Sequence, residues 1–230
     1  MRSDSNLPKE FRDEGQWSLD PETGSARPDY ERLNSSGTEF HRHSYSGSER
    51  NRLFLNLHGE RFVDISAVSG VDEVADSRSW VKWDFDRDGW LDIALVNANR
   101  PLLSLFRNQL GSRERECPNN SIAVRFVGAN HVGLGSNTAS NRDGYGAVVL
   151  IETDQLKMRR EHRCGDGYAA QNSSTMMVGI GKASTVRLTV TWPSGETSGP
   201  VVANAGQLVK CFEKRTQAPN GSAFEVREYR

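Results

Sequence analysis

The sequence has no long apolar run and no excess of charge of either sign. Its apolar stretches, such as residues 93–96, are much shorter than the ~20 residues that a membrane-spanning helix needs. The 29 lysines and arginines are balanced by 30 aspartates and glutamates, so the chain lacks the basic character of a protein that binds nucleic acid or an anionic membrane. The start of the chain, "MRSDSNLPKE", is polar, and we therefore expect no signal peptide there.

Cysteines are also scarce. Cys117, Cys164 and Cys211 are too few for a disulfide framework, and their odd number leaves at least one thiol free. We expect reduced thiols, with a Cys164–Cys211 disulfide as the alternative.

The common catalytic motifs are missing as well. The sequence contains no G-x-S-x-G, H-E-x-x-H, P-loop or paired C-x-x-C motif. His58, His131 and His162 stand alone in the sequence, so each is expected to be a satisfied or an exposed side chain. We therefore assign no catalytic residue and no organic cofactor, and we expect a non-catalytic protein.

The composition and hydrophobic patterning of the chain predict four regions. Residues 1–50 are polar and lack sustained periodicity, so they are expected to be disordered. Residues 51–112 and 118–213 consist of short apolar runs interrupted by Gly, Asn and Asp, and residues 214–230 are expected to form a tail. No segment keeps a helical spacing for long, and the chain is therefore predicted to be all-β.

Eleven strands are predicted from these apolar runs. In "TVRLTVTW" (185–192), Val186, Leu188 and Val190 share one face with Trp192, as in a half-buried strand. The predicted strands cover residues 52–57, 61–66, 79–85, 91–96, 102–107, 121–128, 146–152, 156–163, 176–180, 185–192 and 207–213. Arg159, Arg160 and Arg163 are expected to form a solvated basic strand edge.

One stretch concentrates acidic residues. "KWDFDRDGWLDIALV" (82–96) places Asp84, Asp86, Asp88 and Asp92 within nine positions. With Gly89 as the turn residue and the backbone carbonyl of Trp90, these aspartates follow the ligand order of a calcium loop. Position 12, a bidentate Glu in an EF-hand, is Leu95 here, and the flanking segments are predicted strands. The sequence therefore predicts a Ca²⁺ loop on a β-hairpin rather than an EF-hand.

Two other interpretations of the acidic stretch remain open. One is an Asp- and Gly-rich turn that binds no ion. The other is a catalytic acid pair, which we favour less because four crowded carboxylates suit a cation better than a raised pKa.

A short motif that occurs twice indicates an internal repeat. "RLFLN" (52–56) recurs as "SLFRN" (104–108), which aligns Phe54 and Asn56 with Phe106 and Asn108 at a separation of 52 residues. This period lies in the range of propeller blades, but the chain has room for only one and a half of them before residue 113. Exposed strand edges are expected to lead to self-association or to a protein partner.

The motifs of residues 50–213 resemble two known families. "DFDRDGWLDIALVN", with "NRLFLN" before it and "LFRN" after it, is similar to the FG-GAP/VCBS type of propeller repeat. "NRDGYGAVVLI" (141–151), "CGDGYAAQNSSTMMVGIG" (164–181) and "LTVTWPSGE" (188–196) resemble the ASPIC/UnbV domain of the cartilage acidic proteins. Asp166, Met177 and Val178 depart from the usual pattern of that family.

The resemblance implies a partial propeller-like sheet followed by a β-sandwich or barrel. It favours a non-catalytic, calcium-stabilised interaction module, located outside the cell, in the periplasm or at the cell surface. Two alternatives remain: an accessory or catalytic role in a biosynthetic pathway, and a truncated remnant of a longer repeat protein. Within the second domain, Trp192 is expected to anchor the core or its rim. Gln171 and Asn172 are expected to hydrogen-bond the adjacent turn backbone, with ligand recognition as the alternative.

Overall fold

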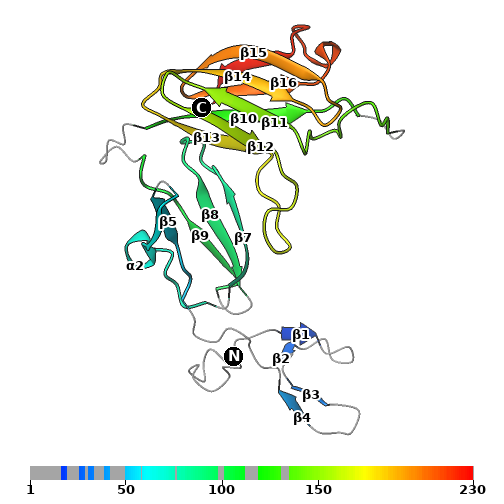
Figure 1. The fold of residues 1–230 in the computed structure, drawn as a ribbon. Coiled ribbons are helices and arrows are strands. Elements are labelled where there is room, and N and C mark those ends of the chain that lie inside the picture. The colour runs from blue at the N-terminus through cyan, green and yellow to red at the C-terminus, as the bar shows by residue number, and fades with distance from the viewer. Residues whose placement is uncertain are drawn as a thin grey trace. The chain divides into compact units, whose positions relative to one another are not determined.

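The computed structural model describes most of the chain after residue 49. It covers residues 50–57, 59–75, 77–97, 101–111, 119–130 and 135–229, and the backbone of four short strands between residues 17 and 41. The chain divides into two compact units, residues 1–80 with 94–106 and residues 81–93 with 107–230 (Figure 1). We describe each unit by itself.

The first unit begins with two small hairpins. Strand β1 (Trp17–Leu19) pairs with β2 (Ala26–Pro28), and β3 (Glu31–Leu33) pairs with β4 (Glu39–His41), all antiparallel. The other residues before Arg50 lie outside the described part of the chain, so the disorder predicted for residues 1–50 stays a prediction.

A third hairpin follows in the same unit. Strand β5 (Phe54–Leu57) pairs with β6 (Arg61–Asp64), and a short helix, α2 (Ser66–Ser69), comes next. The Asn56 side chain accepts a hydrogen bond from the Gly59 amide at 2.7 Å and so closes the turn between the two strands. Gly70 ends α2 in the left-handed region, at φ 79°, where a residue without a Cβ fits best.

Three further strands form a sheet in sequence order. They are β7 (Ser77–Trp83), β8 (Asp92–Asn97) and β9 (Leu103–Phe106), with the order β7-β8-β9. The Asn97 side chain at the end of β8 donates its amide N–H to the Pro101 carbonyl, two residues before β9, at 2.6 Å. The acidic stretch of the sequence lies between β7 and β8.

Two four-stranded sheets make up the body of the second unit (Figure 1). One has the order β13-β10-β16-β17 and the other β12-β11-β14-β15. Among the described strands of these two sheets, only β10 and β16 pair in parallel. The strands are β10 (Asn120–Val127), β11 (Val148–Glu152), β12 (Lys157–Glu161), β13 (Thr175–Gly181), β14 (Thr185–Thr191), β15 (Thr197–Asn204), β16 (Gln207–Phe212) and β17 (Phe224–Glu228).

Side chains from both sheets share one hydrophobic core, so this part is a β-sandwich. The core includes Ile122, Val124, Phe126, Val149, Ile151, Val178, Ile180, Val186, Leu188, Val190, Trp192, Val209 and Cys211. The alternation predicted for "TVRLTVTW" is confirmed, since Val186, Leu188 and Val190 are buried while Arg187 and Thr191 are exposed. Burying alternate apolar residues of paired strands is the main source of stability in such a sandwich.

The predicted all-β class is confirmed. Besides α2, the described residues include one other helical turn, the 3₁₀ turn η1 (Arg215–Gln217). No helix within the described residues has the length and apolarity that crossing a membrane requires. All eleven predicted strands correspond to observed ones, within a few residues at their ends.

Two strands of the sandwich depart from the sequence prediction. β15 contains Gly199 and Pro200, which suggest a turn, yet it lies at a sheet edge, where a proline removes no needed hydrogen bond. β17 lies in the expected tail, residues 214–230, and pairs with β16 from Cys211↔Phe224 to Gln207↔Glu228. The end of the chain is therefore part of the sandwich in this structure.

The basic strand β12 is also an edge strand, as its arginines predict.

Candidate functional site

Three aspartates converge in the loop between β7 and β8. One carboxylate oxygen from each of Asp84, Asp86 and Asp88 lies within 4.8 Å of the others. Arg87 and Gly89 adopt left-handed backbone angles, with φ 58° and 92°. These two residues alternate with the aspartates and curl the backbone, so that the acidic side chains point to a common centre.

The same aspartates hold the loop backbone in place. Asp84 accepts hydrogen bonds from the amides of Asp88, at 3.0 Å, and Gly89, at 2.8 Å. Asp88 in turn accepts a hydrogen bond from the Trp90 amide at 2.8 Å. The turn glycine predicted at position 89 is therefore confirmed, and the loop is closed by its own carboxylates.

Asp92 lies outside the group of three. Its side chain is almost fully buried, and its two oxygens accept hydrogen bonds from the amides of Phe85, at 3.1 Å, and Asn108, at 2.8 Å. The Asn108 side chain donates to the Leu91 carbonyl at 3.2 Å. Asp92 thus ties the two ends of the loop to Asn108, the second residue after β9. Metal-ligand roles for Asp92 and for the Trp90 carbonyl stay predictions.

The electrostatics of the loop favour a bound cation. Burial and the nearby charge of Asp88 raise the pKa of Asp84, although hydrogen bonds from the Gly89 and Asp88 amides and from Tyr229 act in the opposite direction. Arg107 pairs with Asp86 at 2.7 Å and approaches Asp88 at 3.9 Å. The four aspartates of the loop outnumber the two guanidinium groups of Arg87 and Arg107, which leaves net negative charge. All the candidate ligands are hard oxygen atoms, which suit Ca²⁺ better than zinc.

The acidic loop lies against the sandwich within the second unit. The Ser121 hydroxyl on β10 donates to the Gly89 carbonyl at 3.3 Å. Tyr229 hydrogen-bonds to Asp84, and burial together with the Asp84 charge raises the pKa of this phenol to about 12. A small pocket of about 120 Å³ lies here, lined by residues that include Asp88, Trp90 and Met177. Sequence reasoning missed Tyr229, because it lies in the expected tail and carries no local signal.

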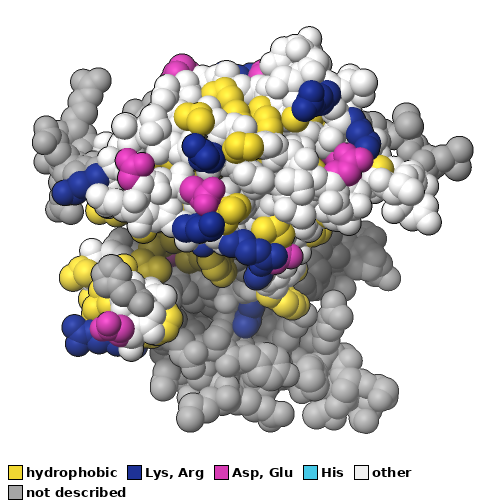
Figure 2. Space-filling model, turned by 45° about the horizontal axis from the view of Figure 1, so that its top comes forward, with side chains coloured by type: hydrophobic (Ala, Val, Ile, Leu, Met, Phe, Trp, Pro, Cys, Tyr) yellow, Lys and Arg dark blue, Asp and Glu magenta, His cyan; other side chains and the backbone are white. Residues whose placement is uncertain are grey.

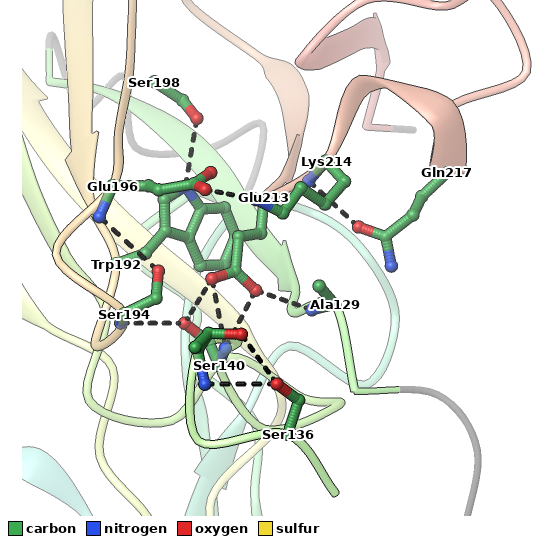
Figure 3. Close-up of polar contacts among 11 residues, drawn as sticks. Ala129, Ser136, Ser140, Trp192, Ser194, Glu196, Ser198, Glu213, Lys214 and Gln217 are labelled. Atoms are coloured by element: carbon green, nitrogen blue, oxygen red, sulfur yellow. Dashed lines mark hydrogen bonds and ion pairs between the residues drawn. The ribbon is translucent and has the colours of Figure 1, made fainter.

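A second polar centre lies inside the sandwich, at the end of β16 (Figure 3). Glu213 is buried, and its carboxylate accepts hydrogen bonds from the Ala129 amide at 2.7 Å and from the Ser140 hydroxyl at 2.9 Å. The Ser140 amide donates to both carboxylate oxygens at 3.0 Å. Burial raises the pKa of Glu213, but the hydrogen bonds from Ser194, Ser140 and Ala129 outweigh it, and the pKa lies below its ordinary value.

This network joins loops that are far apart in the sequence. The Ser194 amide donates to the Ser140 hydroxyl at 3.4 Å, which connects the "WPSGE" turn to the loop before β11. Trp192 is buried beside it, and its Nε1 donates to the Ser198 hydroxyl at 3.0 Å. The Ser140–Glu213 pair is buried and connects the loop before β11 to the end of β16. The predicted role of Trp192 as a core anchor is confirmed.

The remaining residues singled out from the sequence have structural contacts. Gln171 accepts a hydrogen bond from the Gly165 amide at 2.7 Å, as predicted for a turn contact. Asn172 instead accepts one from the distant Lys82 amide, at 2.9 Å. Cys164 is exposed and Cys211 is buried, and both are free thiols. Cys117 lies outside the described residues, as do the side chains of His58 and His131.

The fold of the second unit is an all-β sandwich, and a family model matches part of it. Residues 135–218 match the model of the family described as ASPIC and UnbV. The match includes Ser140, Trp192 and Glu213, so the predicted ASPIC/UnbV resemblance is confirmed for these residues. The matched segment does not reach residues 51–112, where the resemblance to FG-GAP/VCBS repeats stays a prediction. None of the curated proteins matches the chain.

Proposed function

We propose that this chain is a non-catalytic interaction module whose β7–β8 loop binds one Ca²⁺. The observation that carries the proposal is the convergence of three carboxylates within 4.8 Å on a loop with left-handed turn residues. Asp84, Asp86 and Asp88 would be the principal ligands, with the Trp90 carbonyl and Asp92 completing the set. No residue type in the loop recruits zinc, and crowded ionised carboxylates are stabilised by a divalent cation.

The ligand set also supports a weak site. The loop has no bidentate Glu at position 12, and Arg107 already neutralises part of the charge on Asp86. We therefore expect a dissociation constant of ~10⁻⁴ to 10⁻³ M, as in extracellular calcium modules. Such a site fills where calcium is millimolar, so we propose an extracellular, periplasmic or cell-surface location.

Calcium is expected to stabilise the fold. At ~100-fold excess over the dissociation constant, the ion adds ~2.7 kcal/mol to the free energy of unfolding, provided that it does not bind the unfolded chain. Thermal melts in excess calcium and in chelator measure this increment. Asp86→Ala should abolish it, whereas Asp154→Ala, an exposed aspartate in a different turn, should leave it unchanged. A wild-type melting temperature that chelation does not change would identify the loop as an acidic turn without an ion.

The interaction role is supported by exposed apolar side chains in the first unit. Figure 2 shows hydrophobic side chains, in yellow, on the surface of the part that holds β5 and α2. Phe54 and Phe62 are 54% and 66% exposed. They share one face of the hairpin, because Phe62 pairs with Asn56 and Asn56 is two residues after Phe54 on the same strand. On β9, Leu103 and Leu105 are exposed as well. A two-stranded hairpin is marginal alone, so we propose that strands of a partner chain or of a second copy cover these faces.

Association is expected to depend on that hairpin. Phe62→Asp should weaken concentration-dependent self-association, because it places a charge on the apolar face that a second copy would cover. Light scattering over a wide concentration range measures the change. Val202→Asp is the matched control, since Val202 on β15 is 63% exposed but lies in the other unit. A wild type that stays monomeric throughout, with no partner in solution, would contradict self-association.

A further inference from the structure

A buried histidine lies between two aromatic rings near the edge of the sandwich. His162 follows β12 and is only 4% exposed. Its imidazole stacks on the Tyr145 ring, with centroids 4.6 Å apart at 16°, and on the Phe126 ring, with centroids 5.0 Å apart at 27°. Phe126 in turn meets Trp192 edge to face, so this stack is continuous with the core.

Only one imidazole nitrogen has a hydrogen-bond partner. The side chain donates to the backbone carbonyl of Asp143, while Nε2 is buried and unpartnered. The neutral ring tolerates this arrangement, since Nε2 is then an acceptor without a proton. Protonation would place a buried N–H donor, with a charge, where the structure offers no acceptor, and this is the costlier state.

The histidine also holds a turn in place. The Gly146 amide donates to the His162 carbonyl at 2.7 Å, and the His162 amide donates to the Ala147 carbonyl at 2.8 Å. Within the turn, Asn141 exchanges hydrogen bonds with the backbone of Tyr145 at 2.7 and 2.9 Å. The ring stack and the Asp143 contact therefore fasten residues 141–146 to the start of β11 and the end of β12.

Charged neighbours act on the imidazole from each side. On the turn, Asp143 favours the protonated ring, but its carboxylate already pairs with Arg142 at 3.0 Å. The charge of Arg125 on β10 helps to lower the pKa of Asp143, and the charge of Cys164 helps to raise the pKa of Tyr145. Along its own segment, Glu161 and Arg163 pair with each other at 3.5 Å. The aromatic faces favour a cation modestly.

Burial nevertheless dominates. It lowers the pKa of His162, even though the Asp143 backbone contact and the Asp143 charge act to raise it. The geometry also favours the neutral imidazole, because the ring is enclosed and its second nitrogen is unpartnered.

We propose that His162 is an acid-sensitive latch of the sandwich: the neutral imidazole fastens the turn at residues 141–146, and protonation releases it. An unfolded histidine titrates near 6.5. Because the folded pKa of His162 is lower than this, its contribution to the free energy of unfolding is fully present above about pH 6.5 and is lost as the pH falls below it. Within this window the folding equilibrium constant falls by up to about tenfold for each pH unit. Glu213 does not contribute there, since its carboxyl group titrates at lower pH.

The test compares the full chain with His162→Phe, which keeps a stacking ring and removes the titration. Denaturant unfolding at pH 7.5 and 5.5 should show a loss of folding constant about three- to tenfold larger in wild type than in the variant. The other four histidines are common to both chains and cancel in the comparison. Equal losses in the two chains would overturn the proposal.

A second readout uses the wild type alone. The imidazole proton signals of His162, followed by NMR, should titrate at a lower pH than the ordinary histidine midpoint near 6.5. The protection factor of the Gly146 amide, which corrects for the pH dependence of intrinsic exchange, should fall below about pH 6.5 by more than that of a core strand such as β14. A His162 midpoint at or above 6.5, or a Gly146 amide that exchanges in step with β14, would contradict the latch.

Discussion

Replacing Glu213 by glutamine is expected to lower the free energy of unfolding by about 1.5–3 kcal/mol, because it weakens charge-assisted hydrogen bonds and leaves buried donors unsatisfied. The carboxylate accepts hydrogen bonds from the amides of Ala129 and Ser140 and from the Ser140 hydroxyl. A carboxamide presents an NH₂ group to some of these donors, which leaves buried N–H groups without acceptors. Chemical denaturation of the two chains at neutral pH measures the difference.

Glu196→Gln is the matched control for this prediction. It makes the same chemical change at the residue just before β15, where Glu196 forms an exposed ion pair with Lys214. Exposed ion pairs contribute at most about 1 kcal/mol, so the control should cost little. Similar losses of unfolding free energy in both variants would contradict a stabilising role of the buried Glu213 network.

The Glu213 prediction includes a dependence on pH. The pKa of Glu213 is lower in the folded protein than its ordinary value near 4.5. Its contribution to stability is therefore complete above the unfolded-state pKa and is lost as the pH falls through the folded one. Glu213→Gln should remove this part of the acid dependence, which lies below the range in which His162 acts.

The second large effect is expected at Trp192. Trp192→Ala should cost about 3–5 kcal/mol, since it opens a cavity in the core and removes the partner of the Ser198 hydroxyl. Trp192 is 2% exposed, and its ring meets Phe126 at 6.0 Å between centroids. Trp192→Phe keeps an aromatic ring in contact with Phe126 and should cost clearly less. Equal costs for the two variants, or a cost below about 1 kcal/mol for alanine, would contradict the central position of Trp192.

The sequence predicts the sandwich strands well where apolar residues alternate. In β14, the period of two places Val186, Leu188 and Val190 on the buried face, and local pattern alone suffices. β15 and β17 have weaker patterns, because edge strands bury only part of one face and tolerate proline or charge. Their strand state depends on pairing with β14 and β16, which no local window of sequence contains.

The candidate sites show the same limit. The spacing of Asp84, Asp86 and Asp88 is enough to predict that their side chains converge. The backbone contacts of Asp92 with Phe85 and Asn108 depend on how the loop meets the end of β9. Glu213 and Ser140 are 73 residues apart, so their contact follows from the fold alone. A buried, unpartnered nitrogen on His162 likewise has no sequence signal.

Calorimetric titration of the full chain with Ca²⁺ tests the central claim most directly. We predict binding of one ion per chain, with a dissociation constant of ~10⁻⁴ to 10⁻³ M. Asp88→Ala should lose this binding, because Asp88 belongs to the converging group. Asp154→Ala, measured in parallel, should bind as the wild type does. The absence of binding at ~10 mM calcium, well above that range, or binding that Asp88→Ala leaves intact, would contradict a calcium site in the β7–β8 loop.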